Sequence, residues 1–105
     1  MCNRILLLGL IMFSNAGITA EFGDALALHQ NQNYGAALTV FEALAKSGSA
    51  PAQFMLGVMH DNGQGIPEND VEAVRWYQLA AEQGDSDAQF NLALMYENGE
   101  GVTQD

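Results

Sequence analysis

A repeated segment constrains the fold of this chain more than any other feature of its sequence. Residues 52–69 align with residues 88–105 at an offset of 36, and eight of the 18 paired positions are identical. The identical positions include apolar residues, such as Leu56 and Leu92, and loop glycines, such as Gly63 and Gly99. A period between 20 and 50 residues is typical of stacked supersecondary units. Because 34–51 also aligns weakly with 70–87, we predict a degenerate unit at 21–48, a full unit at 49–84 and a partial unit at 85–105.

Each unit is predicted to contain two helices. In the full unit, apolar residues recur at helical spacing after Pro51, and Gly63 ends this first helix by adopting a left-handed conformation. A second helix is expected from about Asp70 to Gln83, because Asn69 with Glu72 three residues later resembles a capping box. The third unit starts with Ser86 or Asp87 as its cap, and its helix is expected to run to Glu97, before Asn98 and Gly99. The second helix has an inward stripe of small and aromatic residues: Ala73, Trp76, Tyr77, Ala80 and Ala81. The predicted fold class is therefore all-α, built from stacked helix hairpins.

The spacing of these residues resembles the Sel1-like repeat, a relative of the tetratricopeptide repeat. The resemblance rests on the pattern Ala52-Gln53-Phe54-x-Leu56-Gly57, Asn62-Gly63-x-Gly65-Ile66-Pro67 and Ala73-x-x-Trp76-Tyr77-x-x-Ala80-Ala81-x-x-Gly84. It covers residues 49–105 clearly and residues 21–48 loosely. The resemblance implies a short right-handed superhelix, an α-solenoid, that serves as an adaptor for protein partners, often in bacterial envelopes or export pathways.

Four features depart from the family pattern. His60 occupies a position where the family favours tyrosine, and Ala93 one where it favours glycine. In the first unit Val40 aligns with Trp76, and the loop between the two helices, residues 31–33, is short. These departures predict that the first unit is a cap of the solenoid.

The N-terminal segment, residues 1–20, is predicted to be a secretory signal peptide. One cation, Arg4, precedes an apolar run at residues 5–13 and a tail of small residues. The apolar run is shorter than the roughly 20 residues that span a bilayer. Cleavage is expected before Glu21, with Ser14-Asn15-Ala16 as the second choice of site. An uncleaved anchor or an apolar first helix is the alternative, and the predicted localisation is periplasmic or secreted in a bacterium.

The charge of the chain excludes several classes of partner. Its 13 acidic and three basic residues give a formal net charge of −10. Lys46 and Arg75 are the two basic residues beyond position 20, too few to bind the phosphates of a nucleic acid. An anionic membrane surface would repel the chain for the same reason, so we expect no membrane insertion after removal of the signal. The single cysteine, Cys2, excludes a disulfide framework.

Residues with catalytic or metal-binding chemistry occur singly in the sequence. His29 and His60 have no second ligand at a recognised metal spacing. Ser47, Ser49 and Ser86 have no neighbouring base that would activate a nucleophile. The loops at 61–65 and 97–101 lack the alternating carboxylates of a calcium loop. The sequence therefore predicts no catalytic residue, no cofactor and no metal site.

The predicted function is that of an exported, non-catalytic adaptor that binds a protein or peptide in the cell envelope. The candidate contacts are Gln53, Gln89, Asn91 and Tyr96, which belong to the first helices of the units. The alternative is a small envelope hydrolase or a cell-wall-binding protein of the same fold. The helix expected in the partial third unit carries an apolar stripe of Leu92, Met95 and Tyr96, with no following helix of its own to bury it. Three interpretations are open: a truncated fragment, self-association of two copies, or a partner that supplies the missing helix.

Overall fold

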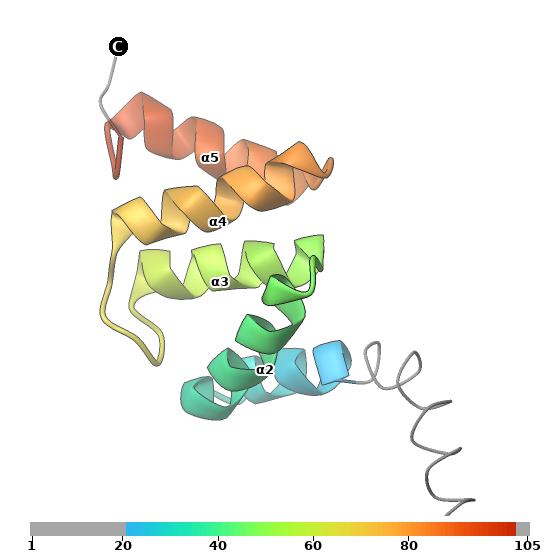
Figure 1. Ribbon diagram of the computed structural model, residues 1–105. Coiled ribbons are helices and arrows are strands. Elements are labelled where there is room, and N and C mark those ends of the chain that lie inside the picture. The colour runs from blue at the N-terminus through green and yellow to red at the C-terminus, as the bar shows by residue number, and fades with distance from the viewer. Residues whose placement is uncertain (1–20, 103–105) are drawn as a thin grey trace, which may run out of the picture.

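The computed structural model describes residues 21–102, and the residues that it describes form a stack of helices (Figure 1). Residues 21–30 are helical, and four further helices follow: α2 (Tyr34–Lys46), α3 (Ala50–Asn62), α4 (Asp70–Glu82) and α5 (Ser86–Asn98). Residues 21–102 contain no strand. The predicted all-α solenoid of helix hairpins is thereby confirmed. The predicted signal peptide lies outside the described residues.

The helices α3, α4 and α5 begin where a polar side chain caps the first turn, whereas α2 has no side-chain cap. Ser49, Asn69 and Asp85 each accept a hydrogen bond from the backbone N–H three residues later, at 3.3, 3.1 and 2.9 Å respectively. Each such cap stabilises a helix by about 1 kcal/mol. The prediction that Ser86 or Asp87 caps the last helix is wrong by one residue or two. Asp85 fills this role because it lies 36 residues after Ser49 and therefore takes the equivalent place in the repeat.

Glycines end the first helix of each later unit, as predicted. Gly63 follows α3 with φ +68°, and Gly99 follows α5 with φ +71°. A side chain at such a backbone angle is strained, whereas glycine adopts it readily. The chain therefore leaves α3 and α5 in the same left-handed backbone conformation.

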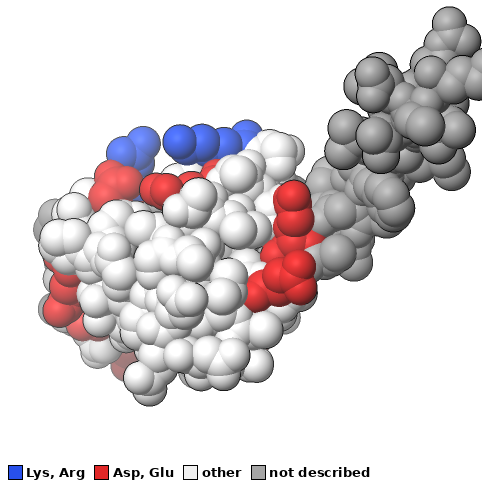
Figure 2. Space-filling model, turned by 90° about the horizontal axis from the view of Figure 1, so that it is seen from below, with Lys and Arg blue, Asp and Glu red and all other residues white. Residues whose placement is uncertain are grey.

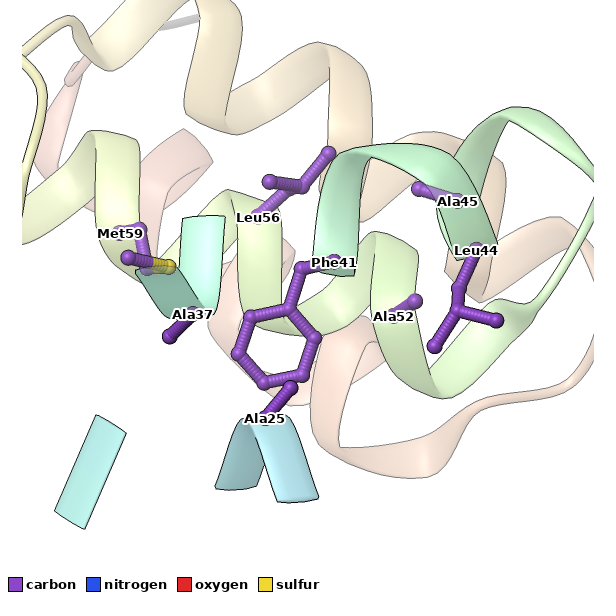
Figure 3. Close-up of a cluster of buried hydrophobic side chains, with 8 residues drawn as sticks. All are labelled: Ala25, Ala37, Phe41, Leu44, Ala45, Ala52, Leu56 and Met59. Atoms are coloured by element: carbon purple, nitrogen blue, oxygen red, sulfur yellow. The ribbon is translucent and has the colours of Figure 1, made fainter. Parts of the chain in front are cut away.

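The first hydrophobic core lies between residues 21–30, α2 and α3 (Figure 3). Phe41 is fully buried at its centre and meets the ring of Phe22 edge-on, with the ring centroids 5.6 Å apart. Burying a phenylalanine side chain contributes about 1.5–3 kcal/mol. The buried residues of this core are Ala25, Ala37, Phe41, Leu44, Ala45, Ala52, Leu56 and Met59. The short first unit thus closes one end of the stack.

The second hydrophobic core joins α3, α4 and α5. Its buried residues are Ala73, Val74, Tyr77, Ala80, Ala88 and Met95. Of the predicted inward stripe of α4, Trp76 and Ala81 are only partly buried, and Trp76 packs against the first core instead. Val74, which the prediction omitted, is buried because α5 packs on the far side of α4 from α3 (Figure 1). No helix among residues 21–102 is long and apolar enough to cross a membrane.

Candidate interaction surface

Gln53, the first predicted contact residue, is buried inside the stack. Its side chain is only 6% exposed. Its Nε2 donates a hydrogen bond to the carbonyl oxygen of Ala45 at 3.2 Å, and its Oε1 accepts one from Nε2 of Gln83 at 2.9 Å. Both ends of the amide are therefore used within the fold. Gln53 joins α3 to the end of α2, and its side chain is not accessible to a partner.

Gln89 makes the same inter-helix bond one repeat later. Its Nε2 donates to the carbonyl oxygen of Ala81 at 3.1 Å, and Gln89 and Ala81 lie 36 residues after Gln53 and Ala45. Unlike Gln53, Gln89 is exposed. The repeat alignment already paired the two glutamines, but spacing alone did not show that both bond to the preceding helix.

Asn91 belongs to a polar network that crosses the second core. Its Nδ2 donates to the hydroxyl oxygen of Tyr77 at 3.3 Å, and that hydroxyl donates to Oδ2 of Asp61 at 3.4 Å. Side chains from α3, α4 and α5 meet in this way. Tyr77 is 1% exposed, and burial raises its pKa to about 12, with the hydrogen bond from Asn91 acting in the opposite direction. The network positions the helices, and it leaves Asn91 only partly accessible.

Carboxylates gather around Asp61. Burial raises the pKa of Asp61 above its usual value, and repulsion from Asp70, Glu100 and Glu68 raises it further. The hydrogen bond from Tyr77 lowers the same pKa and offsets part of this effect. Within residues 21–102, no group of three or more His, Cys, Asp or Glu side chains has the arrangement of a metal site.

Tyr96, the last predicted contact residue, is 43% exposed on α5. Its hydroxyl oxygen accepts a hydrogen bond from Nε2 of Gln78 on α4 at 2.9 Å. In the preceding unit, the equivalent residue is His60, which is buried. Tyr96 therefore combines an accessible ring with an anchored hydroxyl, which is suited to contact with a partner.

Two large apolar side chains of α5 are exposed although they are not among the predicted contact residues. Phe90 is 64% exposed and Leu94 is 41% exposed, both on α5. We expected Leu92, Met95 and Tyr96 to form the uncovered stripe of this helix. That expectation is wrong for Met95, which is buried in the second core, and for Leu92, which packs against it. The repeat alignment could have identified the exposed pair, because Phe90 and Leu94 align with Phe54 and Val58, which pack against the second core.

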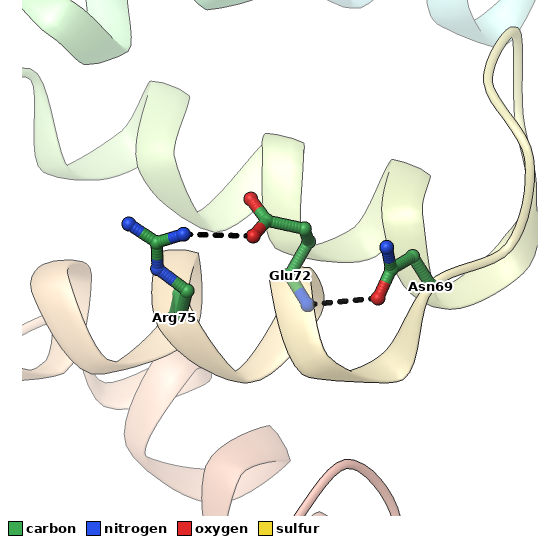
Figure 4. A network of polar contacts seen from close by, with 3 residues as sticks. All are labelled: Asn69, Glu72 and Arg75. Atoms are coloured by element: carbon green, nitrogen blue, oxygen red, sulfur yellow. Dashed lines mark hydrogen bonds and ion pairs between the residues drawn. The ribbon is translucent and has the colours of Figure 1, made fainter.

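Among the described residues, acidic side chains far outnumber basic ones, and the two basic side chains lie before residue 76. The basic side chains lie along one edge of the view in Figure 2, and acidic side chains lie both beside them and elsewhere along the outline. Arg75 pairs with Glu72 at 2.8 Å beside the Asn69 cap (Figure 4). This exposed pair contributes at most about 1 kcal/mol. From residue 76 to residue 102 the chain has five carboxylates and no lysine or arginine.

The two histidines and Ser47 occupy packed or hydrogen-bonded positions within the stack. Nε2 of His29 donates to Oε1 of Gln64 at 2.8 Å, and the His29 ring lies beside that of Tyr34 with centroids 5.2 Å apart. His60 is 8% exposed, on α3. The hydroxyl of Ser47 donates to the carbonyl oxygen of Leu44. Each of these side chains thus has a packing or bonding role within the stack.

Comparison with known proteins agrees with this architecture. The Sel1 repeat family matches residues 50–85 and 86–105. A protective antigen from uropathogenic Escherichia coli strains, which displays an SLR fold, is 32% identical over 89% of this chain, with a TM-score of 0.80. A Sel1 repeat protein from Oxalobacter formigenes is 30% identical over 84% of the chain, with a TM-score of 0.79. No curated protein matches.

The fold and these matches define the class of protein: an α-solenoid of helix hairpins with a 36-residue repeat. The chain belongs to the Sel1 repeat family. The matched part of this chain spans only 21% of the E. coli antigen and 38% of the Oxalobacter protein. Sel1 repeat proteins generally mediate protein–protein interaction.

Proposed function

We infer that this chain is an exported, non-catalytic adaptor that binds a protein partner in the bacterial cell envelope. The observation that carries the inference is the exposure of large apolar side chains on a repeat helix, Phe90 and Leu94 on α5. Contiguous apolar side chains on the surface of a soluble fold mark sites of association. Tyr96 and the exposed Gln89 lie on the same helix, and they are proposed as further contacts.

Support for the adaptor function comes from the roles that the polar residues have. Gln53 and Asn91 hold helices together, and His29 and Ser47 bond within the chain. These interactions stabilise a rigid scaffold, and a rigid surface loses less entropy on binding than a flexible one. Because these polar side chains bond within the stack, the proposed partner contacts the exposed residues on its surface.

Export is proposed from the sequence of residues 1–20 alone. The test fuses alkaline phosphatase, which needs disulfides formed outside the cytoplasm, to the end of the full chain. We expect phosphatase activity in a bacterial host, and its loss when Leu6 and Leu8 are both replaced by arginine. Equal activity of the two fusions, or no activity of the parent fusion, would contradict export.

Partner binding is tested by covalent capture. The full chain, purified and carrying a photo-crosslinker, is incubated with envelope extract, and the adducts are identified by mass spectrometry. We expect one or a few specific adducts that diminish with the Tyr96→Asp variant, and no turnover in a parallel screen for cell-wall hydrolysis. Turnover by the parent chain that a single substitution abolishes would instead support the alternative, an envelope hydrolase. Absence of any specific adduct would contradict the adaptor function.

A further inference from the structure

The first helices of successive units pack on their second helices in the same way. The ring of Phe22 meets that of Phe41, and the ring of Phe54 meets that of Tyr77, which lies 36 residues after Phe41. Because Phe54 lies 32 residues after Phe22, the helix at residues 21–30 corresponds to α3 at an offset of 32. The offset is four residues shorter than the repeat because the loop of the first unit is short.

A side-chain hydrogen bond closes the first junction, by which we mean the contact of His29 with the loop after α3. Nε2 of His29 donates to Oε1 of Gln64 at 2.8 Å, and the His29 ring lies beside that of Tyr34. In the same loop Gly65 lies against Tyr34, where an added Cβ atom would come within 3.1 Å of the Tyr34 carbonyl oxygen. Both a side chain and the backbone of this loop are therefore held by the preceding unit.

The second junction, the contact of α3 with the loop after α5, has the same backbone arrangement. An added Cβ atom at Gly101 would overlap the backbone carbonyl of Asp70, so this loop also packs on the preceding unit. Both loops lie on the same side of the stack (Figure 1). The residues of the second junction are the repeat equivalents of those of the first: Asp61 for His29, Asp70 for Tyr34, Glu100 for Gln64 and Gly101 for Gly65. Three carboxyl groups thus replace a histidine, a tyrosine and a glutamine.

The hydrogen bonds of the two junctions differ accordingly. Gln64 bonds to the preceding unit, whereas Oε1 of Glu100 accepts a hydrogen bond from Nδ2 of Asn98, at the end of its own helix, at 3.2 Å. Oδ1 of Asp70 is buried without a hydrogen-bond partner. Two ionised carboxylates have no proton to donate to each other, so the bond of the first junction cannot form at the second unless one group is protonated.

Asp61 is the carboxyl group that the surroundings favour for this proton. Burial raises its pKa, repulsion from Asp70, Glu100 and Glu68 raises it further, and the hydrogen bond from Tyr77 lowers it. These groups belong to α4, the loop before α4 and the loop after α5. A protonated carboxyl group donates a hydrogen bond, and a bond from such a group to a carboxylate is stronger than one between neutral groups.

We propose that the second junction is a proton-dependent latch, in which protonated Asp61 donates a hydrogen bond to Glu100 and fixes the loop after α5 on α4. At neutral pH the two ionised groups repel each other, and the loop is more mobile. The first junction has no such dependence, because His29 donates from Nε2 to the Gln64 amide oxygen whether its ring is neutral or charged. The packing of successive units therefore depends on pH at one junction and not at the other.

Nitrogen-15 relaxation of the isotope-labelled full chain measures the mobility of both loops at pH 7 and pH 4. The order parameters of residues 99–102 are expected to rise from below about 0.6 at pH 7 toward about 0.85 at pH 4. Those of residues 63–66 should stay high at both pH values. A nuclear Overhauser contact between Gly101 and the amide of Val71, which adjoin each other, should strengthen at pH 4. Circular dichroism checks that the chain is folded in both conditions.

Two variants separate the latch from a general effect of charge. Asp61→Asn gives position 61 a permanent donor, and Asp61→His combined with Glu100→Gln rebuilds the pair of the first junction. In both variants the loop should be as ordered at pH 7 as the parent loop is at pH 4. The matched control is Asp24→Asn, at an exposed position of the helix at residues 21–30, and its loop should respond to pH as the parent loop does.

Three results would overturn the proposal. The first is equal order parameters for residues 99–102 of the parent chain at pH 7 and pH 4. The second is a parallel change in residues 63–66, because pH would then act on the whole stack. The third is a folded Asp61→Asn or rebuilt variant whose loop is as mobile at pH 7 as that of the parent chain or of Asp24→Asn.

Discussion

Gly57 on α3 lies directly against the ring of Tyr77 on α4. The ring is 1% exposed and packs beside Phe54. Glycine inside a helix costs about 1 kcal/mol relative to alanine. The close approach of the two helices offsets this cost, because it lets the Tyr77 hydroxyl reach both Asp61 and Asn91. One glycine thus determines how α3, α4 and α5 meet.

Replacement of Gly57 by alanine should destabilise the chain. The added Cβ atom overlaps the Tyr77 ring, and overpacking of a core costs about 1–3 kcal/mol. Alanine returns about 1 kcal/mol through its helix propensity, so we expect a net loss that reaches about 2 kcal/mol. Urea unfolding followed by circular dichroism measures the difference.

Gly35→Ala is the matched control for this substitution. Gly35 lies in α2, and a Cβ atom there would meet nothing within 4 Å. The control variant should be as stable as the parent chain or up to about 1 kcal/mol more stable. Equal effects at positions 35 and 57 would show that the contact with Tyr77 does not constrain the stack.

The two repeat-equivalent glutamines should differ in their contribution to stability. Gln53→Ala removes a buried hydrogen bond to the Ala45 carbonyl, which still accepts one from the Gly48 N–H, at a cost of about 0.5–1.5 kcal/mol. Gln89→Ala removes the same bond at an exposed site, where water replaces the amide, and it should cost less than about 1 kcal/mol. Thermal unfolding of both variants tests this order. A larger loss for Gln89→Ala would contradict the burial of Gln53.

Stability should fall at alkaline pH through Tyr77. Its pKa is about 12 in the folded chain against an ordinary value of 10.0, so the folded state holds the phenol proton more tightly than the unfolded state does. The stabilisation is complete below about pH 10 and is lost as the pH rises toward 12. Urea unfolding at several pH values should show this loss in the parent chain and a weaker one in Tyr77→Phe. The same pH dependence in both would contradict burial of the hydroxyl.

Stability should also depend on the ionisation of Asp61. Because the folded state raises its pKa, the ionised form is disfavoured by folding, and stability increases as the pH falls from neutral through this pKa. Asp61→Asn should therefore raise the melting temperature slightly at pH 7 and have no such effect at pH 3. The exposed Asp24→Asn variant controls for the loss of one charge. A gain at pH 3 equal to that at pH 7 would contradict the prediction.

The repeat spacing predicted the elements of the fold well. Gly63 and Gly99 end their helices as expected, and Asn69 caps α4. These features depend on local backbone chemistry, which residue type and spacing reveal. The cap of α5 was misplaced because Ser86 and Asp87 are also good capping residues, and only the repeat equivalence of Asp85 with Ser49 separates them.

The predicted contact residues were less well placed, because burial depends on how neighbouring units pack. Gln53 and Gln89 have the same side chain and the same bond, yet the end of α4, through Gln83, covers Gln53 alone. Phe90 has the same residue type as Phe54, but it is exposed where Phe54 packs against the second core. A pattern of residue types identifies a helix face, and the presence of a neighbouring helix decides whether that face is buried.

Nuclear Overhauser contacts in the isotope-labelled chain test the repeat most directly. The account predicts a contact between the Gln53 side-chain amide and Ala45, and a matching contact between Gln89 and Ala81, 36 residues later. It also predicts contacts from Asn91 to the Tyr77 ring. Detection of the Gln53 contact without its Gln89 counterpart, or of cross-strand contacts between these segments, would contradict a stack built from one repeated hairpin.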